Sequence, residues 1–174
     1  ADIRSDLPLL ETYATCLKGA SAGDLTRYTF CFWEPSPDGF GHDWEFYQLS
    51  PAAILPFAGR SEAVFWQKER GEMYRLAESV RHLNHAAQNW LRGKLRWHKS
   101  GVVVGIMANI PATIYTGDIY DSNCCAIVPH DPKHATAVWC FCESGEYTKA
   151  LRRINQALAV GSNFALLAVP FDLA

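Results

Sequence analysis

Residues 101–128 read GVVVGIMANIPATIYTGDIYDSNCCAIV and contain the segments that decide the fold. GVVVGIM (101–107) and NCCAIV (123–128) are apolar runs of strand length, which predict buried strands. NIPATIY, between them, predicts a further strand with a proline at its edge. Because helical patterns flank these strands, we expect an α+β domain with a mixed or largely antiparallel sheet and about four helices.

The N-terminal part of the chain alternates between helical, turn and strand patterns. Residues 5–18, SDLPLLETYATCLK, predict a short helix because apolar residues recur at helical spacing. GASAGD (19–24) predicts a turn in which the backbone can approach a partner closely. YTFCFWE (28–34) and WEFYQL (44–49) predict a hairpin with a long turn, and AVFW (63–66) predicts a third strand.

Residues 72–92 show the clearest helical periodicity in the chain. At ~100° per residue they divide into an apolar stripe and a polar arc. The stripe contains Met73, Leu76, Ala77, Val80, Leu83, Ala87, Trp90 and Leu91, and the arc contains Arg81, His82, His85, Gln88, Asn89 and Arg92. Asn84 falls within the stripe, so we expect its side chain to be buried and hydrogen-bonded. Gly93 is expected to end the helix.

The C-terminal part predicts two helices and a closing strand. VPHDPKHATAVWCFC (128–142) starts a helix with Asp131 as N-cap, and Gly145 interrupts it. EYTKALRRINQALAV (146–160) predicts a second helix, and NFALLAVPF (163–171) predicts a strand. The inner face of the second helix is expected to contain Tyr147, Leu151, Ile154 and Leu158.

Size and composition predict one soluble globular domain. The 174 residues are 49% hydrophobic and 20% charged, enough for a single core that can be divided into sub-lobes 1–70 and 71–174. No run of about 18 uncharged apolar residues is present. The first residues also lack the basic and then apolar order of a signal peptide. We therefore expect a soluble, cytoplasmic protein with no membrane partner.

The formal net charge of −2 conceals an uneven distribution. Between Lys68 and Lys99 there are eight Lys or Arg and three Asp or Glu, a net charge of +5, so the rest of the chain carries −7. Cations on the helical arc and in the loop after it can contact phosphates, and amide and guanidinium groups can contact base edges. A solvated helix face followed by a basic loop explains the same pattern equally well.

The six cysteines predict buried, reduced thiols. They are too few for a disulfide scaffold in a chain of this length. A zinc site would have to combine Cys124, Cys125, His130, His134, Cys140 and Cys142. Cysteines two apart on a helix, or adjacent on a strand, point to nearly opposite sides, which argues against such a site. The apolar setting also favours inert thiols over a nucleophile paired with a histidine.

Common catalytic signatures are absent from the chain. It contains no GxGxxG, GxxxxGK[ST], HExxH or GxSxG motif. The sequence therefore shows no active site of its own, and we expect no bound cofactor or metal within these residues.

Five segments in a fixed order are more distinctive than any single motif. They are KGASAGDLTRYTFCFWE (18–34), WEFYQLSPAAILPFAGRSEAVFWQKE (44–69), GEMYRLAESVRHLNHAAQNWLRGK (71–94), GVVVGIMANIPATIYTGDIYDSNCCAIVP (101–129) and SNFALLAVPFDL (162–173). The ordered set resembles the target-recognition region of large adenine-specific DNA methyltransferases. Such enzymes occur in bacterial type IIG restriction-modification systems and in BREX- or DISARM-like phage-defence systems.

The resemblance implies a non-catalytic domain, 1–174, that recognises double-stranded DNA. The S-adenosylmethionine site would belong to a methyltransferase catalytic domain, in the same polypeptide or in a separate subunit. Arg27 lies where the glycine-rich turn 19–24 meets the first strand, and 81–92 matches the central helix. The expected DNA-binding residues are Arg27, Arg81, His85, Gln88, Asn89, Arg92, Lys94, Arg96, Lys99, Asn109 and Thr113.

Two alternative functions remain compatible with the sequence. The chain can be a protein-interaction module that docks onto a methyltransferase or defence-system subunit without touching DNA. In that case CFWEP and WEFYQL would form an exposed apolar patch, and burial of these aromatic side chains would remove the alternative. The third alternative is a small metal-binding domain.

Overall fold

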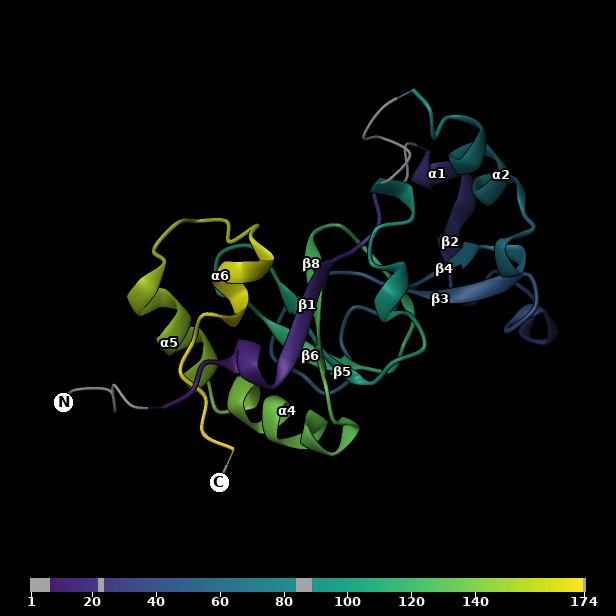
Figure 1. The fold of residues 1–174 in the computed structure, drawn as a ribbon. Helices are drawn as coiled ribbons and strands as arrows, with labels where there is room; N and C mark the ends of the chain where they lie inside the picture. Colours follow the sequence, from purple (N-terminus) through teal and green to yellow (C-terminus); the bar gives the residue numbers. More distant parts are fainter. Residues whose placement is uncertain (1–6, 22–23, 84–88, 174) are drawn as a thin grey trace.

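The computed structural model describes residues 7–21, 24–83 and 89–173, which contain two four-stranded sheets (Figure 1). The larger sheet has the order β1 (Ala14–Lys18), β8 (Cys124–Pro129), β5 (Gly101–Gly105) and β6 (Ala112–Tyr115). All of its neighbouring pairs are antiparallel. This confirms the α+β class and the three strands predicted within residues 101–128.

Strands β5 and β8 are buried along their whole length because both faces of the larger sheet are covered. Alternate side chains enter two separate hydrophobic clusters. The first contains Val102, Val104, Cys125 and Ile127 with residues of α4 (Ala135–Glu143), α5 (Glu146–Ile154) and α6 (Asn163–Leu167). The second contains Val103, Cys124, Ala126 and Val128 with residues of the smaller sheet. Two-sided burial explains why both strands are nearly continuous apolar runs.

The smaller sheet has the order β2 (Thr29–Cys31), β4 (Glu62–Phe65), β3 (Trp44–Gln48) and β7 (Ile119–Tyr120). The third strand predicted at 63–66 is thus present as β4. The predicted hairpin of β2 and β3 is wrong, because β4 lies between them and pairs antiparallel with both. With Ala63 and Val64 fully buried, β4 is well suited to the interior of the sheet.

Each of the two sheets contains strands from both halves of the chain. β7 comes from the C-terminal half and pairs parallel with β3, whereas β1 comes from the N-terminal half and pairs with β8. A boundary at residue 70 therefore does not separate the two sheets.

Short helices complete the described fold. α1 (Leu25–Tyr28) precedes β2, and α2 (Glu72–Ser79) follows β4. The 3-10 turns are η1 (Leu10–Thr12), η2 (Pro37–Gly39), η3 (Gln67–Glu69), η4 (Lys94–Arg96) and η5 (Pro132–His134). In Figure 1, α4, α5 and α6 lie beside the larger sheet, and α1 and α2 lie at the far end of the smaller one.

The helix predicted at 5–18 is wrong over its described part. Leu10–Thr12 form η1, and Ala14–Lys18 form strand β1, which pairs with β8 from Ala14↔Pro129 to Lys18↔Cys125. Pairing with a buried strand outweighs a weak local helical pattern.

The helix predicted at 72–92 is shorter than expected. α2 ends at Ser79, whose hydroxyl donates a hydrogen bond to the backbone oxygen of Leu76 at 2.8 Å. Such local hydrogen bonds compete with helix propagation. Leu83 is 66% exposed and so does not continue the apolar stripe. Asn84 lies outside the described residues.

The last predicted helix and strand also differ from the structure. α5 stops at Ile154, because the Asn155 side chain accepts a hydrogen bond from the Ala157 N–H at 3.0 Å and turns the chain. Ile154 and Leu158 are consequently exposed. Residues 163–171 begin with helix α6 instead of a strand, capped by the Ser162 hydroxyl.

Two predicted helix ends are confirmed. The Asp131 carboxylate accepts a hydrogen bond from the Lys133 N–H at 3.0 Å and caps the turn that leads into α4. Gly145 ends α4 with a positive φ of 78°, a conformation that glycine adopts without strain.

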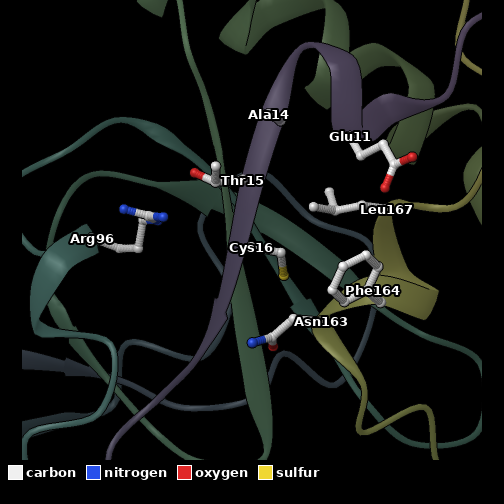
Figure 2. A pocket seen from close by; sticks show the side chains of 8 residues that line it. All are labelled: Glu11, Ala14, Thr15, Cys16, Arg96, Asn163, Phe164 and Leu167. Carbon is white, nitrogen blue, oxygen red and sulfur yellow. The ribbon is translucent and has the colours of Figure 1, made fainter.

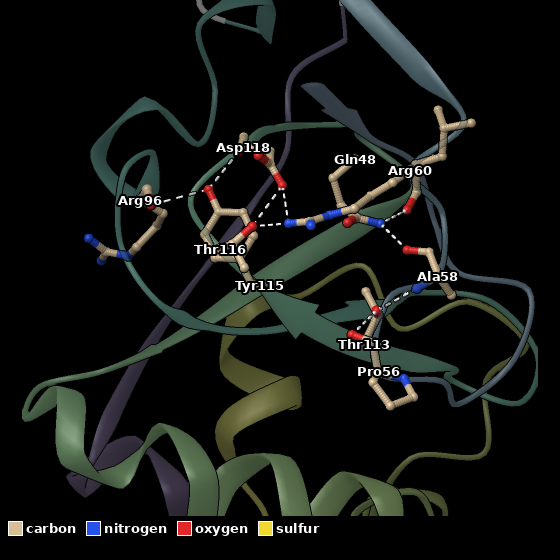
Figure 3. A network of polar contacts seen from close by, with 10 residues as sticks. Gln48, Pro56, Ala58, Arg60, Arg96, Thr113, Tyr115, Thr116 and Asp118 are labelled. Atoms are coloured by element: carbon tan, nitrogen blue, oxygen red, sulfur yellow. Dashed lines mark hydrogen bonds and ion pairs between the residues drawn. The ribbon is translucent and has the colours of Figure 1, made fainter. Parts of the chain in front are cut away.

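A polar network attaches the segment between β3 and β4 to the larger sheet (Figure 3). The Thr113 side chain is fully buried; its hydroxyl accepts from the Ala58 N–H at 2.9 Å and donates to the Pro56 oxygen at 3.1 Å. Arg60 and Asp118 form an ion pair at 2.5 Å. These contacts fix the position of one sheet relative to the other.

We predict that Thr113→Val lowers the free energy of unfolding by about 1–3 kcal/mol, because two buried backbone groups lose their partner without a change of side-chain volume. Chemical denaturation measures the difference. Thr148→Val is the matched control: the Thr148 hydroxyl is buried without a hydrogen-bond partner among the described residues, so its removal should be neutral or stabilising. Equal losses in the two variants would contradict the assignment.

Candidate nucleic-acid interface

Three of the predicted DNA-binding cations already have carboxylate partners. Arg27 pairs with Glu72 at 2.5 Å, Arg81 with Glu78 at 3.2 Å and Lys94 with Glu69 at 2.6 Å. These are surface pairs, with Arg27 and Arg81 more than half exposed, so each is worth little and can be exchanged for another anion. All three acidic residues of the basic stretch 68–99 are therefore paired with cations.

Asn89 and Arg92 are engaged with each other. The Arg92 guanidinium donates to the Asn89 side-chain oxygen, and the Asn89 backbone oxygen accepts from the Ser21 N–H at 2.9 Å. The glycine-rich turn is thereby attached to the end of the basic helical segment. Residues His85 and Gln88, predicted to lie on the same arc, fall outside the described residues.

Arg96 and Lys99 differ from these cations, because neither forms an ion pair within the described chain. Both line a cavity of about 640 Å³, which we call the cationic pocket. The other lining residues are Thr15, His98, Ser100, Val128, Pro129, His130 and Pro132. No carboxylate is among them, so the pocket combines positive charge with room for an anionic group.

Arg96 also borders a second cavity of about 370 Å³ that follows edge strand β1 (Figure 2). Arg96 and Thr15 lie on one side of the strand, and Phe164 and Leu167 of α6 lie on the other. The Arg96 Nε is buried and has no hydrogen-bond partner among the described residues. A buried donor without a partner is unfavourable unless water or a ligand satisfies it.

The turn that carries Arg96 is held firmly in place. The neighbouring Trp97 is only 5% exposed and packs edge-on against Trp66, with ring centroids 5.2 Å apart. The Tyr115 hydroxyl lies within hydrogen-bond distance of the backbone oxygens of Arg96, at 3.2 Å, and Asp118, at 2.7 Å. The guanidinium therefore projects from a fixed backbone, which lowers the entropy lost on binding.

Asn109 and Thr113 do not join this group. Asn109 is exposed in the turn after β5, at the end of the strand opposite Lys99. Thr113 cannot contact a base edge in this conformation, since its hydroxyl is buried and fully hydrogen-bonded. The sequence predicted Thr113 as a base contact because the pattern of NIPATIY does not reveal that the segment between β3 and β4 covers this side chain.

The structure adds basic side chains that the sequence did not assign to DNA binding. His130 follows β8 and reaches the cationic pocket, because β8 ends beside the loop that leads into β5. A separate polar cavity of about 380 Å³ is lined by His42, Asp43, Gln67, Lys68, Arg70 and Arg75. Lys68, Arg70 and Arg75 belong to the basic stretch 68–99, which was the feature of the sequence that could have identified them.

Glu45 is a partly buried carboxyl group that interacts electrostatically with one residue of each of these cavities. Burial raises the pKa of its carboxyl, whereas the charges of His98 and Lys68 act in the opposite direction. His98 borders the cationic pocket and Lys68 borders the separate polar cavity. The two cationic regions are therefore within electrostatic reach of one carboxylate.

The cysteines are arranged as packing residues. Adjacent Cys124 and Cys125 enter different hydrophobic clusters, and Cys140 is exposed while Cys142 is buried, as their spacing predicts. Burial raises the pKa of the Cys16, Cys124 and Cys142 thiols. Among the described residues, no three His, Cys, Asp or Glu side chains come together as a metal site.

No family model matches the chain, and no curated protein matches it significantly. Within the described residues, no helix has the length and apolar character needed to cross a membrane.

We predict that a thiol reagent such as 5,5′-dithiobis(2-nitrobenzoate) modifies Cys140 first in the native protein. Cys31 should react more slowly, because partial desolvation and the Glu34 carboxylate raise its pKa. The other four thiols are buried and should react only on unfolding. Cys140→Ser should remove the fast phase, and persistence of that phase would contradict the prediction.

Proposed function

We propose that the chain is a sequence-specific recognition domain for double-stranded DNA, serving an S-adenosylmethionine-dependent adenine DNA methyltransferase or restriction-modification enzyme. The observation that carries the proposal is the cationic pocket. Arg96 and Lys99 face it without a carboxylate partner in the described chain. The ordered resemblance to target-recognition regions supplies the biological setting.

The pocket suits a phosphate group of the DNA backbone. A guanidinium can donate two parallel hydrogen bonds to phosphate oxygens. Lys99 adds a point charge that tolerates several positions of the anion. Such contacts fix the register of a protein on the duplex but do not read its sequence.

Base contacts would come from the neighbouring basic segment. Arg81 can release Glu78 at small cost, because an exposed ion pair is worth about 0–1 kcal/mol. Arg92 would exchange its part-buried hydrogen bond to the Asn89 side chain for one to DNA. Together with His85, Gln88 and Asn89 they offer the donors and acceptors that distinguish base pairs in the major groove. Arg27, Lys94 and Asn109 would contact the backbone or flanking bases.

Methyl transfer itself would take place on another domain. The described residues present no motif or cluster that we can assign to S-adenosylmethionine or to the target amino group. A catalytic domain, in the same polypeptide or in a partner subunit of a cytoplasmic defence system, would supply both and form the second wall of the DNA cleft. Binding of duplex DNA by the isolated chain should therefore be weak and strongly salt-dependent.

We predict that Arg96→Ala combined with Lys99→Ala weakens duplex binding about ten- to hundredfold at low salt, because two charged contacts are lost. The slope of log K against log salt concentration should fall by about 1.8, at about 0.9 per phosphate contact. Fluorescence anisotropy with a labelled duplex at several salt concentrations measures both quantities.

The matched control removes the same charge from another surface. Lys149→Ala with Arg153→Ala alters two exposed cations of α5 and should change binding only slightly. Equal losses in the two double variants would show that net charge alone matters and would reject the pocket. Wild-type binding that does not depend on salt would reject DNA recognition itself.

A further inference from the structure

One face of the smaller sheet carries a continuous group of aromatic rings, which we call the aromatic face. It contains Phe30, Phe32, Trp33, Phe40, Trp44, Phe46 and Phe65. Strand pairing explains the group: Phe30 and Phe46 flank Ala63, and Trp44 lies opposite Phe65. Side chains at paired positions project to the same side of a sheet.

The rings of the aromatic face are ordered by contact with one another. Phe30 meets Trp44 edge-on with ring centroids 5.4 Å apart, and Phe40 and Phe46 are 4.7 Å apart. Ring pairs at these separations attract each other beyond the effect of burial. A preformed group of this kind loses little side-chain entropy when a partner covers it.

These rings remain open to solvent although the opposite face of the sheet is covered. Trp33 is 66% exposed and Phe30 42% exposed. On the other face, Tyr47 and Val64 are fully buried in the second hydrophobic cluster. Rings exposed together in one group, unlike scattered apolar residues, mark an interaction surface.

The charge around the aromatic face determines the kind of partner. Residues 28–48 contain four Asp or Glu and no Lys or Arg. Of these, Glu34 and Asp38 lie in the segment between β2 and β3 away from any Lys or Arg in sequence, whereas Asp43 lines the separate polar cavity. The Glu34 carboxylate is fixed beside the rings by the Cys31 N–H, which donates to it at 2.7 Å. This acidic border repels phosphate, so stacked nucleic acid bases are an unsuitable occupant.

We propose that the aromatic face binds a protein segment that presents aliphatic side chains together with arginine. Aliphatic groups would cover the rings, and a guanidinium can stack on an aromatic ring while it pairs with a carboxylate such as Glu34. This surface is distinct from the cationic pocket, so protein docking and DNA binding can occur on one chain. The inference does not depend on the proposed function.

A second copy of the chain is a poorer occupant. It would have to offer a different surface, its own basic segment 68–99, to the aromatic face. Contact between two different surfaces of identical chains is also head-to-tail and produces open assemblies unless the rotation closes a ring.

The experiment titrates the isotope-labelled chain with five-residue peptides, acetylated and amidated, that alternate leucine with arginine, lysine or glutamate. NMR should show the arginine peptide shifting the ring resonances of Phe30, Trp33 and Phe46. The lysine peptide should bind several-fold more weakly, because an ammonium lacks the planar stacking surface. The glutamate peptide should bind about tenfold more weakly or not at all, because the border is acidic.

Two variants and a matched control complete the test. Phe32→Ser with Trp33→Ser should weaken binding of the arginine peptide about tenfold, because two exposed aromatic side chains that would contact the peptide are lost. Leu158→Ser with Phe164→Ser changes two apolar residues elsewhere that are even more exposed and should leave binding unchanged. Glu34→Gln retains an acceptor for the Cys31 N–H and should reduce the preference for arginine over glutamate several-fold.

Three results would overturn the proposal. The first is equal affinity for the arginine and glutamate peptides. The second is loss of binding in the Leu158 and Phe164 control as large as in the Phe32 and Trp33 variant. The third is concentration-dependent self-association, measured by sedimentation, that Phe32→Ser with Trp33→Ser abolishes and that excludes the peptide; this would assign the face to a second copy.

Discussion

The antiparallel pairing of β5 with β8 is the interaction on which the rest of the structure depends. The two strands pair from Val102↔Ile127 to Gly105↔Cys124, and their side chains alternate between two hydrophobic clusters. A shift of the register by one residue would exchange the two sets of side chains. The register therefore decides at once how the helices pack on one face and how the smaller sheet packs on the other.

This arrangement separates two surfaces of different chemistry. The loop before β5 brings Arg96 and Lys99 beside the end of β8, where no acidic residue lines the cavity. The smaller sheet uses one face to cover the larger sheet and leaves its aromatic face open, with an acidic border. Opposite charge on the two surfaces favours different partners, an anionic duplex for one and a cationic protein segment for the other.

The sequence predicted those parts of the fold in which local pattern and burial agree. β5 and β8 were predictable because they are apolar throughout, and the Asp131 cap because its chemistry is local. β1 was not, since its conformation comes from pairing with a strand more than a hundred residues away. Of the predicted site, the basic character of residues 68–99 is present, but the sequence alone could not distinguish cations paired with glutamates from the unpaired Arg96 and Lys99.

Site-specific photo-crosslinking tests the central claim, that duplex DNA lies against the cationic pocket, most directly. A benzoylphenylalanine in place of Ser100 borders the pocket and leaves its cations intact, whereas the same group in place of Lys149 lies on α5. Irradiation with a radiolabelled duplex should give a salt-sensitive crosslink at position 100 and little at position 149. Crosslinking that is equal at the two positions, or stronger at 149, would contradict the account.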